Sequence, residues 1–147
     1  MNGFEYQAAV HMIQEGFAAE GMEIIKAVRD RYDGERRNPW NEQECGHYYA
    51  RSMASFSLLP AVSGFIFDLP ENKIGFNPIY SGDFSTVWFL DPAWGTFVIK
   101  GNTAELSVKA GALTLKELSL PFFVKEPILF EPAVVITPEN PLRINLK

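Results

Sequence analysis

The side chains best suited to chemistry crowd into one short segment of this 147-residue chain. Within 16 consecutive positions the segment combines charged, aromatic and imidazole side chains, namely Arg36, Arg37, Trp40, Glu42, Glu44, His47, Tyr48, Tyr49 and Arg51. Sugars stack their C–H faces on aromatic rings and need paired donors and acceptors for their hydroxyls, so this composition suits sugar binding. The alternative is a solvated loop with surface ion pairs, which are common and contribute only about 0–1 kcal/mol each.

Glu42 and Glu44 are better suited to binding a sugar than to cleaving one. A glycosidase needs two carboxyl groups on opposite sides of the scissile bond, about 5–5.5 Å apart for retention and about 6.5–9.5 Å apart for inversion. Two residues at positions i and i+2 of one loop rarely face each other across a substrate. His47 could act as an acid or base, but no neighbouring side chains form a triad-like arrangement with it. Arg51 favours a functional site, because an unpaired guanidinium would be costly inside its otherwise apolar and aromatic helical run.

Three helices are expected in the first half of the chain to position this segment. Apolar residues recur at helical spacing over residues 3–17, 22–32 and about 46–59. The first pattern is apolar nearly all round, which predicts a buried helix. Residues 34–45 have no usable period and contain a proline, so they are expected to form a long loop, and Pro60 is expected to kink or end the third helix.

The second half of the chain has the alternation that is typical of antiparallel strands. Polar and apolar residues alternate over residues 95–100, 103–109 and 112–118, and short glycine-containing turns separate these runs. A meander is the simplest arrangement of the three strands. Eight of the ten prolines follow residue 68, so only short edge strands are expected in the tail, where residues 133–137 would cover the sheet or pair at its edge.

Composition restricts the class of protein. Hydrophobic residues make up 47% of the chain, which is enough for one domain-sized core. The net charge of −5 provides no basic field for nucleic acid or an anionic membrane surface, so neither partner is expected. The sequence has neither a long apolar stretch nor an export signal, which predicts no transmembrane segment. Cys45 is the single cysteine, and no zinc-like or glycine-rich cofactor motif is present, so we expect a reducing compartment such as the cytoplasm and no metal or cofactor.

Four blocks of the first half stand in a recognisable order: residues 3–9 (GFEYQAA), 28–34 (VRDRYDG), 37–46 (RNPWNEQECG) and 47–55 (HYYARSMAS). Together they resemble the end of the catalytic domain of glycoside hydrolase family 116, whose best known members are the non-lysosomal glucosylceramidases and bacterial β-glucosidases. The resemblance implies an α+β chain. Residues 1–68 would be the C-terminal helices of an (α/α)6 barrel with a sugar-binding loop at residues 34–46, and residues 69–147 would form a small antiparallel β-sheet region.

The resemblance also implies a role in binding glucose. The family hydrolyses β-glucosides with retention through a Glu nucleophile and an Asp acid/base that lie upstream of this segment, so the isolated chain of such a hydrolase would be inactive. Glu42, with Glu44 as the alternative, and Arg51 match residues that hydrogen-bond glucose, and Trp40 and His47 complete the expected substrate site. The ligand would be a β-glucoside or a glucosylceramide-like substrate, and the protein partner would be the missing upstream part of the barrel.

Two alternatives stay open. A methionine two residues before the first block suggests a truncated or split gene, or an expressed fragment. The chain could instead be a non-catalytic carbohydrate-binding or scaffolding module, in which the loop around Trp40 binds sugar and the sheet provides an interaction surface. It could also be an inactive gene remnant, which predicts exposed apolar helix faces and self-association.

Overall fold

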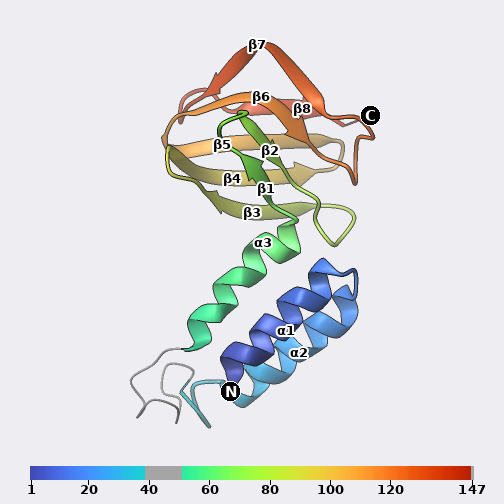
Figure 1. The fold of residues 1–147 in the computed structure, drawn as a ribbon, viewed down its shortest axis with the longest axis vertical. Coiled ribbons are helices and arrows are strands. Elements are labelled where there is room, and N and C mark those ends of the chain that lie inside the picture. The colour runs from blue at the N-terminus through green and yellow to red at the C-terminus, as the bar shows by residue number, and fades with distance from the viewer. Residues whose placement is uncertain (39–50, 147) are drawn as a thin grey trace. The chain divides into compact units, whose positions relative to one another are not determined.

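The computed structural model of the chain describes residues 1–38 and 51–146, except for the side chain of Arg51 (Figure 1). The chain divides into two compact units, Met1–Val62 and Ser63–Lys147. The first unit is helical, and the second contains all the strands that the structure describes. The α+β class that the sequence predicts is therefore confirmed.

A pair of helices forms the centre of the first unit. Helix α1 (Asn2–Gln14) packs against helix α2 (Ala18–Arg31). The two helices approach closely at Gly21, because a Cβ atom there would lie 2.7 Å from Ile13 Cγ1 and 2.8 Å from the carbonyl oxygen of Ala9. An ion pair between Glu5 and Arg31 also joins the helices. The close approach at Gly21 requires a small residue where the helices cross.

Replacing Gly21 with alanine is expected to lower the free energy of unfolding by about 1–3 kcal/mol, because the added methyl group has no room between the helices. Helix propensity alone would give the opposite sign, since alanine is favoured over glycine by about 1 kcal/mol. Chemical denaturation followed by circular dichroism measures the difference. Ala19→Ser on an exposed position of the same helix is the control and should change stability by less than about 0.5 kcal/mol. An increase in stability for Gly21→Ala would show that the helices are not in close contact there.

The third helical segment differs from the expected single helix. It consists of a 3-10 helix, η2 (Arg51–Ser57), followed by α3 (Leu58–Ser63). Pro60 does not end α3, which continues for three more residues to Ser63. The change from the 3-10 helix to the α-helix occurs two residues before this proline, at Leu58.

The expectation of C-terminal (α/α)6 barrel helices followed by a small antiparallel sheet region is wrong. The described residues form three short α-helices, one 3-10 helix and eight strands in two sheets. Helix α1 is also not buried on every side, because the side chain of Phe4 is 52% exposed. Apolar spacing predicts the helix, but α1 buries only part of its surface, including Tyr6, Ala9 and Ile13, and it packs against both α2 and η2.

The second unit is built from two four-stranded sheets (Figure 1). The first sheet has the order β1 (Ile66–Asp68), β2 (Lys73–Gly75), β6 (Leu113–Ser119) and β7 (Ile128–Ile136). The second sheet has the order β3 (Phe84–Phe89), β4 (Ala93–Lys100), β5 (Thr103–Gly111) and β8 (Leu142–Asn145). Both sheets contribute to one apolar core, in which the rings of Phe76 and Phe97 stack with centroids 4.0 Å apart.

The strand positions predicted in the second half are confirmed, but the meander is wrong. Strands β4 and β5 form the expected antiparallel hairpin. Strand β6 then leaves this sheet and pairs in parallel with β2 and antiparallel with β7. Leu113, Leu115 and Leu118 are thereby buried in the shared core from the opposite side. The alternation of a strand does not specify which of two sheets it joins, because either one buries its apolar face.

The tail of the chain pairs at an edge, as predicted. Strand β7 is the edge strand of the first sheet and includes residues 133–136. It is nine residues long, although the prolines predicted only short strands. The pairing shifts between Leu115, opposite Val134, and Glu117, opposite Leu129, so Pro132 lies in a bulge that needs no ladder hydrogen bond.

Candidate functional site

The loop that the sequence analysis identified lies mainly outside the described residues. Trp40, Glu42, Glu44 and His47 belong to residues 39–50, and the side chain of Arg51 is also outside the described part. Their sugar-binding roles therefore stay predictions.

The start of that loop is described. The carboxylate of Asp33 accepts backbone hydrogen bonds from Arg36 at 2.8 Å and from Glu35 at 3.0 Å. These bonds stabilise the ionised form, so the N–H of Arg36 is the main reason that the pKa of Asp33 lies below its usual value. The guanidinium of Arg37 lies 6.0 Å from the ring centroid of Tyr32. The turn at residues 33–36 thus has a defined local structure of its own.

A second candidate site lies on the face of the β3–β4–β5–β8 sheet that points away from the core. Buried residues alternate with more exposed ones along β4, which places Trp94, Thr96, Val98 and Lys100 on this side. We call it the outer face and define it by Ser85, Val87, Phe89, Trp94, Thr96, Val98, Lys100, Thr103, Glu105, Ser107, Arg143 and Asn145. It combines exposed rings with a hydrogen-bonded set of polar side chains.

The rings belong to Phe89 and Trp94, which are cross-strand partners at the end of the β3–β4 hairpin. Their centroids are 5.9 Å apart and their planes differ by 17°. The hairpin loop between them is closed by hydrogen bonds between the backbones of Leu90 and Ala93. Phe89 is 61% exposed and Trp94 is 43% exposed, so this aromatic pair presents a large apolar surface to solvent from a rigid hairpin.

A bulge next to the aromatic pair sets the position of Trp94. Trp94 pairs with Ala110, and Gly95 pairs with Val108, so Lys109 has no partner on β4. Gly95 is required at this point because a Cβ atom would lie 1.8 Å from the carbonyl oxygen of Ser107. The close approach of β4 and β5 at Gly95 therefore places Trp94 beside the polar part of the outer face.

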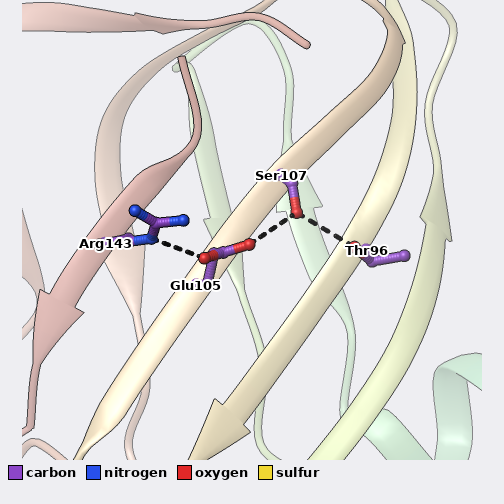
Figure 2. A network of polar contacts seen from close by, with 4 residues as sticks. All are labelled: Thr96, Glu105, Ser107 and Arg143. Carbon is purple, nitrogen blue, oxygen red and sulfur yellow. Dashed lines mark hydrogen bonds and ion pairs between the residues drawn. The ribbon is translucent and has the colours of Figure 1, made fainter. Parts of the chain in front are cut away.

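Four polar side chains form a row that crosses β4, β5 and β8 (Figure 2). The hydroxyls of Thr96 and Ser107 are 3.1 Å apart, and Ser107 Oγ donates to Glu105 Oε1 at 3.4 Å. Glu105 Oε2 accepts from Arg143 Nε at 2.7 Å. We call this set the polar row. Both Glu105 oxygens are engaged within it, whereas the terminal nitrogens of Arg143 point away from Glu105 in Figure 2.

The aromatic pair and the polar row are close enough to act on one ligand. Trp94 and Thr96 are two residues apart on one strand face, which separates their Cα atoms by roughly 7 Å. This distance is comparable to the width of a sugar ring. A sugar stacked on Trp94 could therefore hydrogen-bond to the hydroxyl of Thr96, whereas Ser107 is buried and already bonded to Thr96 and Glu105.

The sequence analysis missed this site, although a signal was present. Phe97 and Ile99 follow Trp94 at odd spacings, so burial of those two residues requires Trp94 to point outward with Thr96. The link from Glu105 to Arg143 had no such signal, because 38 residues separate them along the chain.

Comparisons with known proteins do not assign a family: no protein-family model matches the chain, and no curated protein matches it either. The resemblance to glycoside hydrolase family 116 therefore stays a prediction. None of the helices in the described ranges combines the length and apolar character needed to cross a membrane.

Proposed function

We propose that the chain is a non-catalytic carbohydrate-binding module that binds sugars on the outer face of its β3–β4–β5–β8 sheet. The observation that carries this proposal is the exposed Phe89–Trp94 pair next to the polar row. Aromatic rings provide contact area at low entropic cost, and neighbouring hydroxyl, carboxylate and guanidinium groups provide orientation.

The number of carboxylates on the outer face favours a binding function over a catalytic one. Within the described residues that define it, Glu105 is the one carboxylate, and it is held by Arg143 and Ser107. A glycosidase needs two such groups, one on each side of the scissile bond. The outer face has the chemistry to hold a sugar but lacks this pair.

A second function rests on the resemblance alone. The loop would then contribute Glu42 and Arg51 to the glucose subsite of a β-glucosidase-like or glucosylceramidase-like hydrolase. Both proposals expect a sugar ligand, but they place the sugar on different residues. Variants of the loop and of the sheet therefore separate them.

Titration calorimetry of the whole chain with a panel of neutral and acidic oligosaccharides tests the proposed function. We expect saturable binding of at least one oligosaccharide below millimolar concentration, and no release of chromophore from an aryl β-glucoside. Loss of binding in Arg51→Ala, with binding retained in outer-face variants, would transfer the site to the loop. Absence of binding to every oligosaccharide at millimolar concentration would refute the proposal.

A further inference from the structure

We infer that the outer face selects acidic oligosaccharides, in which carboxylated sugars contact Arg143 while a neighbouring unit stacks on Trp94. This inference rests on the proposed function and names its ligand class. It follows from the charges on the outer face, from the free atoms of Arg143, and from the distance between Arg143 and the aromatic pair.

The charges of this sheet oppose those of the whole chain. The residues that define the outer face include two cations, Lys100 and Arg143, and one carboxylate, Glu105, which is a net charge of +1. The whole chain has a net charge of −5. Among the described residues, no ion pair engages Lys100. A face of this charge favours an anionic ligand more than the rest of the chain does.

Two further carboxylates border the sheet. Asp83 lies at the start of β3 and accepts the backbone N–H of Gly101 at 2.8 Å. Asp91 lies in the hairpin loop beyond the aromatic pair, at the opposite end of β3 from Asp83. Neither aspartate is among the cross-strand partners of Arg143, which pairs with Glu105. In the strand pairing of the described residues, Glu105 is the carboxylate that stands opposite Arg143.

Arg143 is positioned to bind a second carboxylate, to which it would donate hydrogen bonds. Its Nε donates to Glu105, and its side chain is 69% exposed. Glu105 fixes one edge of the guanidinium, which leaves the terminal N–H groups for a ligand. The planar donors of arginine match the two oxygens of a carboxylate, so a uronic acid fits this position better than a neutral sugar.

The ligand must be longer than one sugar. Arg143 stands opposite Glu105, which stands opposite Val98, whereas the aromatic ring belongs to Trp94. Trp94 and Val98 are four residues apart on β4, a distance of roughly 13 Å. Arg143 also lies two strands from β4, roughly 10 Å across the sheet, so the diagonal separation from Trp94 is roughly 16 Å. An oligosaccharide that crosses β4, β5 and β8 diagonally contacts both Trp94 and Arg143, and a monosaccharide does not.

A single-stranded nucleic acid also combines flat rings with negative charge, but the outer face favours a sugar. It has two cations, Lys100 and Arg143, and Arg143 is already paired with Glu105. A nucleic-acid site needs a cation for each of many phosphate contacts, which two cations do not provide. The polar row also offers hydroxyl groups, which suit sugar hydroxyls.

The test compares two ligands that differ only at C6: cellohexaose and the cellouronic acid hexamer, in which each C6 hydroxymethyl group is a carboxylate. Both present the same C–H faces to Trp94. We expect calorimetry at low salt to show about tenfold tighter binding of the hexauronate, and this ratio should fall as salt is added. Glucuronic acid alone should bind far more weakly than the hexamer.

Variants of Arg143 complete the test. Arg143→Gln is expected to lower the affinity for the hexauronate more than the affinity for cellohexaose, so that their ratio falls toward one. Arg143→Lys keeps the charge without the planar donors and should retain an intermediate ratio. Arg29→Gln, an exposed arginine of α2, is the matched control and should leave both affinities unchanged. Thermal unfolding of each variant reports on folding.

Each remaining outcome decides between the proposals. Equal or tighter binding of cellohexaose would overturn the acidic-ligand inference and leave the carbohydrate-binding function intact. Absence of binding to both hexamers and to the wider panel would refute the proposed function itself. An oligothymidylate that binds as tightly as the hexauronate would overturn the inference in favour of nucleic acid.

Discussion

Replacing Trp94 with alanine is expected to lower the affinity of the chain for its oligosaccharide ligand about 30-fold, which corresponds to about 2 kcal/mol. Trp94 provides the larger ring of the aromatic pair, and Phe89 packs beside it at 5.9 Å. Its removal leaves the polar row without the apolar surface that excludes water from the sugar. Titration calorimetry with the oligosaccharide that binds most tightly measures the loss.

Two control variants separate stacking from general damage. Trp94→Phe keeps an aromatic ring and should retain most of the affinity. Phe122→Ala removes an exposed ring that contacts Phe123, with centroids 5.1 Å apart, outside the outer face, and should have no effect on binding. If Trp94→Ala and Phe122→Ala bind sugar equally well, Trp94 is not part of the site.

Replacing Phe97 with alanine is expected to lower the free energy of unfolding by about 3–5 kcal/mol. Phe97 is fully buried between the sheets, and its ring stacks on that of Phe76 at a centroid distance of 4.0 Å and an angle of 4°. Truncation removes this contact and leaves a cavity lined by residues of both sheets. Such a loss is a large part of the roughly 5–15 kcal/mol that stabilises a typical domain.

Chemical denaturation of the whole chain measures this effect, with methyl signals of Leu115 reporting on the β unit. Leu115 is fully buried in the same core, so its signals follow the unfolding of the sheets rather than that of the helical unit. Val98→Ala is the matched control, because Val98 is the next residue of β4 and points to the outer face. It should cost less than about 1.5 kcal/mol. A loss below 1 kcal/mol for Phe97→Ala would contradict its place at the centre of the core.

Local patterns in the sequence were sufficient to locate most of the elements. The helices of the first unit follow the spacing of their apolar residues, and α2 ends shortly before Gly34, which has a φ of 90° that glycine adopts readily. Strands β4, β5 and β6 coincide with the alternating runs. These features depend on neighbours within a few residues, and the backbone geometry of each element imposes its own period on the side chains.

The candidate site was predicted only in part. The sequence analysis expected sugar chemistry and allowed the sheet to serve as an interaction surface, but it assigned the sugar to the loop around Trp40. The aromatic pair requires only the hairpin register that brings Phe89 opposite Trp94, so it could have been deduced from the alternation. The polar row could not, because Arg143 reaches Glu105 only after β8 has paired with β5.

The sequence by itself thus determined α1, α2, the three central strands and the outward direction of Trp94, because helical and strand periods are local properties of the chain. Tertiary structure alone decided that β6 pairs with β2 rather than with β5, and that Arg143 completes a row with Glu105, Ser107 and Thr96. These pairings join segments about 40 residues apart. They are selected because they bury both sheets in one core. The apolar area buried in that core depends on all the strands together and cannot be read from any single segment.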